Sequence, residues 1–168
     1  MAKVKISVQT IYSCSLERAF KTPMLSDVRK VHTGFMIMPK VTHCTEDETW
    51  GQVGGNKKVF VSKSFTQKGG YAGVDTVLER IENEYWKIQV NDFQSWMLGF
   101  IRFVGEWKTI EVSKNKIQIN YTYTLHGKGV LLYPFQWLFA KGFYKIYMRR
   151  VLNNIKKMIE DQEPYLYN

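Results

Sequence analysis

The pattern that most constrains the fold is an amphipathic helix close to the C-terminus. From Tyr144 to Ile159 apolar residues recur at steps of three and four, so they share one side of a helix of about five turns: Tyr144, Met148, Val151, Ile155 and Ile159. The opposite side carries Lys145, Arg149, Asn153, Lys156 and Lys157. A single long helix with one wide apolar stripe must bury that stripe against another layer of structure.

The remainder of the chain predicts that this second layer is an antiparallel sheet. In residues 116–125 an apolar set alternates with a polar one: Ile117, Ile119, Tyr121, Tyr123 and Leu125 against Gln118, Asn120, Thr122 and Thr124. Val4, Ile6 and Val8 alternate with polar residues in the same way near the N-terminus. Such a period of two is typical of strands with one face against protein and the other against water.

Turn signals divide the middle of the chain into three hairpins. Glycines at 51, 54 and 55 precede a β-rich run, the Gly69–Gly70 pair and residues 82–84 bound a second hairpin, and residues 113–115 turn a third. The order is therefore strand, two short helices, about six further strands and one long helix. We expect an α+β fold in which a curved antiparallel sheet of about six to seven strands wraps around the C-terminal helix, with residues 1–168 forming one domain.

Two short helices are predicted directly after the first strand. Ser15 can cap a helix that we expect to end at Pro23. A second helix is predicted over Leu25 to Val31, capped by Ser26 or Asp27.

The apolar stretch before the long helix is too short to span a membrane. Val130 to Phe139 is about half of the ~20 residues that a spanning helix needs, and Pro134 and Gln136 interrupt it. The start of the chain has no apolar run of signal-peptide length. Cys14 and Cys44 match no metal or redox spacing and are expected to be reduced thiols, so we expect a cytoplasmic protein.

The composition favours some partners over others. A net charge of +9 favours anionic partners such as phospholipid surfaces, but the lysines are spread along the chain and form no nucleic-acid motif. We therefore expect a basic surface, no specific nucleic-acid partner, and possible peripheral contact with an anionic membrane. No zinc spacing, phosphate-binding loop or nucleophile elbow is present, so no metal or cofactor is expected.

Three passages resemble the START-like (helix-grip) superfamily, the SRPBCC group of polyketide cyclases, dehydratases and lipid-transport domains. The first is the strand and helix of SVQTIYSCSLERAF, which contains the run LERAF. The second is SWMLGFIRFVGEWKTIEV, with Gly105 to Ile110 similar to the family's G-x-W-x-[LI] strand, followed by the alternating strand KIQINYTYTL. The third is the terminal helix, with its early Pro134 and a tail at Leu152 to Lys156.

The resemblance implies a deep apolar cavity between sheet and helix that holds a hydrophobic or amphipathic small molecule or lipid. The side chains expected to line it are Phe103, Trp107, Tyr121, Tyr123, Tyr144, Met148, Val151 and Ile155. The expected entrance lies between the loops near residues 32–45 and the aromatic start of the last segment, at Tyr133, Phe135, Trp137 and Phe139. The leading hypothesis is a non-catalytic binding or carrier protein.

An enzyme of the cyclase or dehydratase type is the alternative, and it needs an acid or base beside the ligand. Tyr121, Tyr123 and His32 are the candidates, whereas surface or rim positions are expected to explain all three histidines: His32, His43 and His126. Arg102 and Glu106 share one face of their strand, opposite the aromatic face. We expect this pair in water; with the faces reversed, a buried pair would indicate an anionic ligand group.

A membrane-surface lipid-transfer module is the third hypothesis. In that case Trp137 and Phe139 would dip into the interface, while Lys141, Lys145, Arg149 and Arg150 would meet anionic headgroups.

Overall fold

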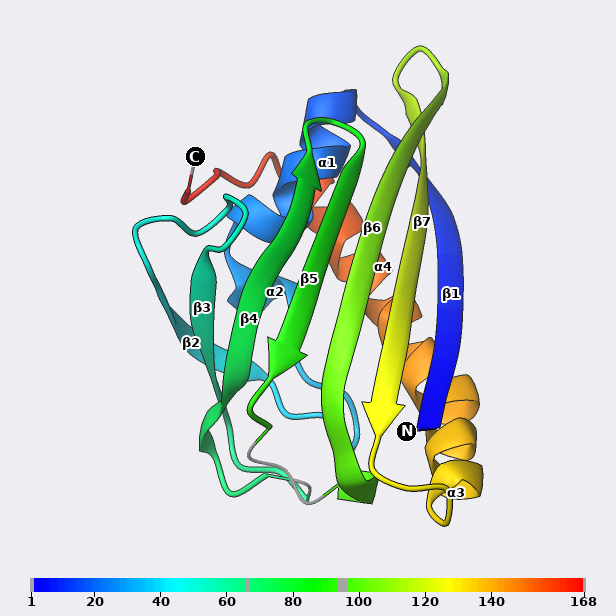
Figure 1. The fold of residues 1–168 in the computed structure, drawn as a ribbon. Helices are drawn as coiled ribbons and strands as arrows, with labels where there is room; N and C mark the ends of the chain where they lie inside the picture. The colour runs from blue at the N-terminus through cyan, green and yellow to red at the C-terminus, as the bar shows by residue number, and fades with distance from the viewer. Residues whose placement is uncertain (1, 66, 94–96, 168) are drawn as a thin grey trace.

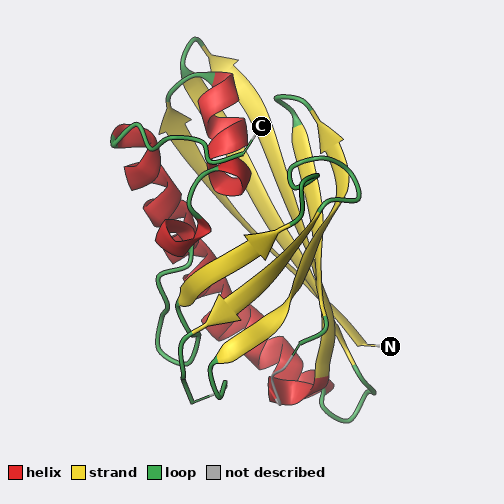
Figure 2. Ribbon diagram, turned by 90° about the vertical axis from the view of Figure 1, so that its left-hand side faces the viewer, coloured by secondary structure: helices red, strands yellow, loops and turns green. Residues whose placement is uncertain are grey.

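In the computed structural model a curved antiparallel sheet wraps around one long helix (Figure 1; Figure 2). The structure describes residues 2–65, 67–93 and 97–167, so Ser95 and Trp96, which open one of the passages quoted above, lie outside the described residues. The strands are β1 (Ala2–Ser13), β2 (Val41–Glu46), β3 (Asn56–Val61), β4 (Gly70–Ile81), β5 (Tyr85–Asn91), β6 (Phe100–Ser113) and β7 (Lys116–Gly127). The helices are α1 (Leu16–Leu25), α2 (Val28–Val31), α3 (Tyr133–Leu138) and α4 (Lys145–Glu160), with a 3₁₀ turn η1 (Met97–Gly99) and a π-helical segment η2 (Phe139–Tyr144).

The described strands form a single seven-stranded sheet in the order β1-β7-β6-β5-β4-β3-β2. Consecutive strands are neighbours except at β1, which pairs with β7, so the connection through α1 and α2 crosses from one edge of the sheet to the other. The α+β fold predicted from the alternation and the helical spacing, a curved antiparallel sheet around the C-terminal helix, is therefore confirmed, and it is the helix-grip arrangement that the family resemblance implied.

The sheet has one face against the helix and one polar face, as its alternation predicts. Ile6 pairs with Tyr123 and Val8 with Tyr121 on the buried face. Between them, on the outer face, the hydroxyls of Ser7 and Thr122 lie 2.8 Å apart.

Helix α1 does not end at Pro23, which corrects the prediction from sequence. Ser15 caps it as expected, its Oγ accepting from the Arg18 amide at 3.2 Å, but the helix continues to Leu25. Proline at position 23 cannot donate to the carbonyl of Ala19 four residues earlier. The Trp107 indole N–H donates to that carbonyl instead, at 3.2 Å, so the proline is tolerated inside the helix.

Two further indoles hold the same end of α1 against the sheet. Trp86 donates to the Phe20 carbonyl at 2.9 Å, and Trp50 donates to the Met24 carbonyl at 3.1 Å. All three indole bonds are buried. The Met24 carbonyl lies in the last turn of α1, where carbonyls lack an intrahelical donor, and the Ala19 carbonyl lacks one because of Pro23. Helix α2 then begins three residues later than predicted, and Asp27 rather than Ser26 caps it, accepting from the Arg29 amide at 2.9 Å.

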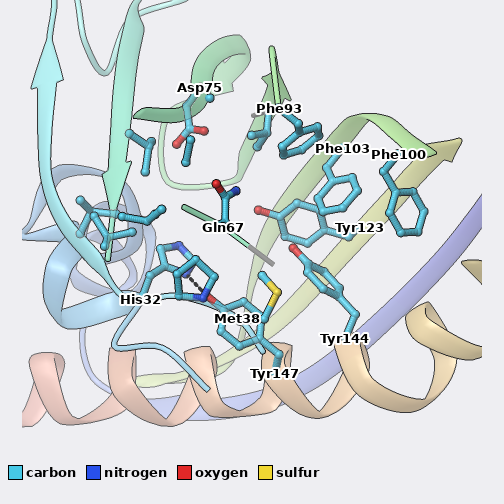
Figure 3. A pocket seen from close by; sticks show the side chains of 18 of the residues that line it. His32, Met38, Gln67, Asp75, Phe93, Phe100, Phe103, Tyr123, Tyr144 and Tyr147 are labelled. Atoms are coloured by element: carbon cyan, nitrogen blue, oxygen red, sulfur yellow. Dashed lines mark hydrogen bonds between the residues drawn. The ribbon is translucent and has the colours of Figure 1, made fainter. Parts of the chain in front are cut away.

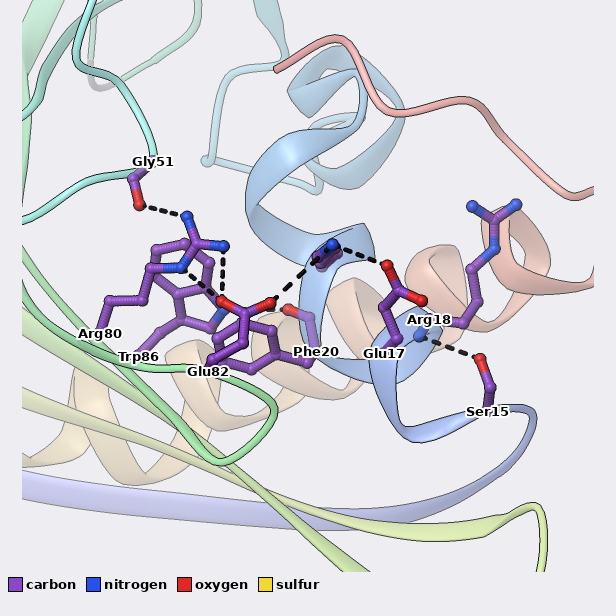
Figure 4. Close-up of polar contacts among 9 residues, drawn as sticks. Ser15, Glu17, Arg18, Phe20, Gly51, Arg80, Glu82 and Trp86 are labelled. Atoms are coloured by element: carbon purple, nitrogen blue, oxygen red, sulfur yellow. Dashed lines mark hydrogen bonds and ion pairs between the residues drawn. The ribbon is translucent and has the colours of Figure 1, made fainter. Parts of the chain in front are cut away.

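A row of charges at the protein surface connects α1 with the β4–β5 turn (Figure 4). Lys21 lies 2.6 Å from Glu17 and 3.8 Å from Glu82. Arg80 contacts Glu82 at 2.7 Å and donates to the Gly51 carbonyl at 2.8 Å. Partly exposed pairs of this kind stabilise a fold by little, about 0–1 kcal/mol each. The placement of α1 therefore depends chiefly on the buried indoles.

The C-terminal helix lies across the concave face of the sheet (Figure 2). The residues of the predicted apolar stripe are buried, and Leu152 receives a buried hydrogen bond from the Tyr12 hydroxyl on β1 at 2.7 Å. The helical region begins earlier than expected, because α3 and the π-helical segment precede α4 without a break. None of the helices in the described part of the chain has the length and apolar character needed to cross a bilayer.

Candidate ligand-binding cavity

A cavity of about 170 Å³ lies between the sheet and the helical layer (Figure 3). Its apolar wall comes from β2 to β6 and their connections, and includes Val41, Val59, Val61, Ile88, Val90, Phe93, Phe100 and Phe103. Its polar lining consists of His32, Gln67 and Asp75 together with the hydroxyls of Tyr123, Tyr144 and Tyr147. The cavity is thus mainly apolar with a few polar groups, which is the usual character of small-molecule sites.

A second cavity of about 40 Å³ lies nearer to α1. It is lined by Trp86, Trp107, Tyr121, Val151 and Ile155. The two cavities share lining residues, among them His32, Asp75 and Tyr123, so these side chains form the partition between them.

The eight side chains proposed from sequence to line a cavity divide between these spaces. Phe103, Tyr123 and Tyr144 line the larger one. Trp107, Tyr121, Val151 and Ile155 line the smaller one. Met148 is buried in the core and lines neither.

The aromatic face of β6 is the inner one. Arg102 and Glu106 lie on its opposite face, where the Tyr85 hydroxyl donates to Glu106 at 2.8 Å and Arg102 donates to His126 Nδ1 at 3.3 Å. His126 shares that face but is only 5% exposed, so the surface position expected for it is wrong. Burial, together with the positive charges of Arg102 and Lys3, lowers the pKa of His126.

His32 lines the cavities instead of lying at a rim. It follows α2 directly, and its Nδ1 lies 2.7 Å from the Tyr147 hydroxyl on α4 (Figure 3). Burial, and secondly the positive charge of Lys57, lower the pKa of His32 to about 4. The imidazole is therefore neutral near pH 7. His43, by contrast, is exposed and stacks on Phe60 outside both cavities.

A lysine and an aspartate face each other inside the structure, and the sequence reading missed both. Lys57 on β3 pairs in register with Asp75 on β4, and Lys57 Nζ lies 3.7 Å from Asp75 Oδ2. Lys57 is 4% exposed, and its Nζ lies 4.0 Å from the centre of the Trp50 ring. Burial raises the pKa of Asp75, and Lys57 opposes that rise. The alternation of the strands could have revealed both residues. Lys57 lies two positions before the inward-facing Val59, and Asp75 two positions before the inward-facing Val77, so each shares the inner face of its strand.

Three tyrosines, two from β7 and one from the π-helical segment, form a connected group beside the two cavities. The ring of Tyr123 lies 5.2 Å from that of Tyr121 and 5.5 Å from that of Tyr144, between their centres. Burial raises the pKa of Tyr123 to about 12, and hydrogen bonds with Tyr121 and Tyr144 moderate the rise. These phenols are protonated at neutral pH, so they can donate or accept hydrogen bonds but cannot act as bases.

Gly105 makes room for this group. It pairs in register with Tyr123, and a Cβ at position 105 would lie 2.8 Å from Cζ of the Tyr123 ring. Only a glycine lets the ring lie against β6 at this point. The glycine of the G-x-W motif noted in the sequence therefore has a packing role beside the cavity.

The residues proposed as an entrance lie elsewhere. Tyr133, Phe135 and Trp137 are exposed on α3 and line neither cavity. Their neighbour Phe139 is buried, with its ring 5.6 Å from that of Phe100. The loops contribute Met38, Pro39, Gln67 and Phe93 to the larger cavity.

The described residues contain no group of three or more His, Cys, Asp or Glu side chains that could hold a metal ion. Cys14 and Cys44 are both free thiols. Burial raises the pKa of each, most strongly that of Cys44, to about 12.

Solved structures share this fold over almost the whole chain. Ara h 8.0201 has a TM-score of 0.70 and 14% identity, and the match covers 95% of this chain and 99% of that one. Norcoclaurine synthase from Thalictrum flavum, in complex with dopamine and hydroxybenzaldehyde, has a TM-score of 0.62 and 10% identity, with 97% and 90% covered. SA2116 from Staphylococcus aureus, of unknown function, has a TM-score of 0.72 and 15% identity, with 96% of both chains covered.

The sequence matches no family model and no curated protein. The structural likeness nonetheless shows that the chain has the helix-grip fold that its resemblance to START-like proteins implied. At identities of 10–15% a structural likeness shows the fold alone, so function has to be inferred from the residues of the cavity.

Proposed function

We propose that this protein binds one small, mostly apolar molecule in the cavity between sheet and helix, and carries or sequesters it without altering it. The cavity itself is the observation that supports this most. Its volume of about 170 Å³ is close to that of a cavity of ~150 Å³ known to hold benzene. A single aromatic ring or a short alkyl chain, with one polar group, fits such a space.

The polar groups of the wall suit binding better than catalysis. His32 is neutral and bonded to Tyr147, Asp75 faces Lys57, and the phenols keep their protons at neutral pH. Each can meet a hydroxyl or carbonyl of a ligand. The ligands of the T. flavum norcoclaurine synthase structure, dopamine and hydroxybenzaldehyde, are single-ring molecules of this size, and they guide the choice of probes.

A matched pair of variants tests the proposal. Purified protein is extracted and analysed by mass spectrometry for a retained small molecule, and hydroxybenzaldehyde and decanoic acid are titrated by calorimetry. Val90→Phe puts a larger side chain into the cavity and should weaken binding at least tenfold. Val104→Phe makes the same change on the outer face of β6 and should leave binding unchanged. Absence of any retained molecule and of any binding, or equal loss in both variants, would sink the proposal.

An enzyme of the cyclase or dehydratase type is the second candidate function. One observation favours it: His32 and Asp75 line the same cavity, and their pKa values are shifted in opposite directions. The pKa of His32 is lowered and that of Asp75 is raised. Both shifts move a pKa through burial, and perturbed acids and bases gather at active sites. Asp75→Asn and His32→Gln should then abolish turnover of a polyketide-like substrate without abolishing its binding. Equal turnover by both variants and the parent protein would exclude this role.

A further inference from the structure

An apolar surface stands outside the cavity, on the segment that leads into the long helix. We call it the 130–138 surface. Leu131 is 89% exposed, Leu138 63% and Trp137 47%, and Val130 and Phe135 are exposed beside them. Contiguous exposed apolar side chains of this size mark an interaction site.

The π-helical segment is what turns these side chains outward. Tyr144, Tyr147 and Met148 belong to the buried stripe of the long helix. Two turns of a regular α-helix are about seven residues, so an uninterrupted helix would also bury positions 137, 140 and 141. The buried positions are instead 136, 139 and 140, each one residue earlier. A π-helix accommodates one extra residue, so η2 shifts the register by one. As a result Gln136 faces inward and Trp137 faces solvent.

The segment of the chain that carries this surface has positive charges only. Between Val112 and Ile159 the sequence has no Asp or Glu and nine Lys or Arg residues, so the other 15 basic residues are balanced by all 15 acidic ones. The net charge of +9 therefore corresponds to this one segment. Within the part of the chain that the structure describes, Lys128, Lys141 and Lys145, which flank the surface in sequence, form no ion pair with a carboxylate.

The surface is also attached to the wall of the larger cavity. Gln136 Nε2 donates to the Leu98 carbonyl at 2.8 Å, and the Lys128 amide donates to the Gly99 carbonyl at 2.9 Å. These bonds join the segment to the residues just before Phe100, which lines the cavity. In Figure 1, α3 lies at the end of the sheet where β5 and β7 finish.

We propose that the 130–138 surface docks this protein on an anionic membrane surface. Aromatic and aliphatic side chains insert into the interfacial region, and the flanking lysines meet lipid headgroups. The absence of acidic residues over 48 positions favours an anionic bilayer over a second copy of this chain, because two such segments would repel each other. Docking there brings the cavity wall at Phe100 next to the membrane. This docking depends on the 130–138 surface and its flanking lysines, and it does not require the cavity ligand to be a lipid.

Vesicle sedimentation tests the proposal with the full chain. The protein should bind phosphatidylcholine vesicles that contain phosphatidylserine, bind pure phosphatidylcholine vesicles weakly, and lose affinity as salt is added. The double variant Leu131→Ser/Trp137→Ser should weaken binding about tenfold or more. Ile11→Ser/Val53→Ser removes two apolar side chains that are exposed elsewhere and should have no effect.

A charge-matched pair completes the test. Lys128→Gln/Lys145→Gln should weaken binding to the phosphatidylserine vesicles about 25-fold, from about fivefold for each cation. Lys58→Gln/Lys114→Gln leaves the same net charge and should change binding far less. Circular dichroism checks that every variant is folded.

Three results would overturn the proposal. The first is no binding to vesicles that contain phosphatidylserine, and the second is equal binding to both vesicle types. The third is self-association that Leu131→Ser/Trp137→Ser abolishes, measured by analytical ultracentrifugation without lipid, in a protein that does not bind vesicles. That result would assign the surface to a second copy of the chain.

Discussion

Replacing Trp107 should cost stability by an amount that depends on Pro23, because the indole supplies the hydrogen bond that the proline removes. Trp107→Phe keeps an aromatic ring but leaves the Ala19 carbonyl buried without its donor, which costs about 1–3 kcal/mol. The smaller ring adds about 1 kcal/mol, since complete truncation of a buried aromatic costs about 3–5 kcal/mol. We therefore expect a total loss of about 2–4 kcal/mol in the free energy of unfolding.

In a Pro23→Ala background the same replacement should cost only about 1 kcal/mol. An alanine amide at position 23 can donate to the Ala19 carbonyl in the usual helical way, so losing the indole no longer leaves that carbonyl unpaired. The double-mutant cycle should thus show a coupling of about 1–3 kcal/mol between Pro23 and Trp107, whatever Pro23→Ala does alone.

Urea unfolding followed by far-UV circular dichroism measures the four free energies without relying on tryptophan fluorescence. Phe20→Leu, which leaves both the proline and the Trp107 bond in place, provides a second cycle with Trp107→Phe for comparison. If the effects of Pro23→Ala and Trp107→Phe add to within about 0.5 kcal/mol, the indole does not substitute for the missing amide and the reasoning is wrong.

Three further predictions concern the cavity. The pKa of His32 lies at about 4 in the folded protein against 6.5 for an unperturbed histidine, so the unfolded state binds more protons between these values. The neutral His32 side chain therefore contributes at most about 3 kcal/mol to the free energy of unfolding, fully above about pH 6.5 and less and less as the pH falls toward 4. Urea unfolding at several pH values measures this, and an equal decrease with pH in His32→Gln would contradict it. Asp75→Asn should lower the free energy of unfolding by about 3 kcal/mol, because it leaves Lys57 buried without its carboxylate. Adding Lys57→Met should restore most of this loss. Gly105→Ala should cost about 1–3 kcal/mol in urea unfolding and weaken hydroxybenzaldehyde binding, because the new methyl displaces the Tyr123 ring; an unchanged affinity would show that this ring does not shape the cavity.

Local periodicity was enough to predict the architecture. The alternation of Ile117 to Leu125 and the helical spacing from Tyr144 to Ile159 each involve residues that are close in sequence. Each pattern can therefore be recognised without knowing which other element it packs against. Together they required a sheet and a helix that bury each other. The termini of the elements were harder, and Pro23 shows the reason. Its acceptance within α1 depends on an indole 84 residues further along the chain.

The cavity could be predicted only in part for the same reason. Phe103 and Tyr123 were accessible through strand parity, but the meeting of Lys57 with Asp75 depends on the register between β3 and β4, which the loop between them sets. The exposure of Trp137 depends on a one-residue shift in helical register that the apolar composition of the segment conceals. Long-range register, rather than residue type, is the information that a single sequence withholds.

Most polar groups of the cavity wall are already partnered, and this bears on ligand selectivity. His32 contacts Tyr147, Asp75 faces Lys57, and Tyr123 bonds with its neighbouring tyrosines. At these groups a ligand's hydroxyl can bind only by exchanging one hydrogen bond for another, and such an exchange changes the free energy little. We therefore expect the protein to tolerate a polar group at different positions on a ring while rejecting a ligand with a second ring. Discrimination would then operate through size, and a family of related small molecules would compete for one site.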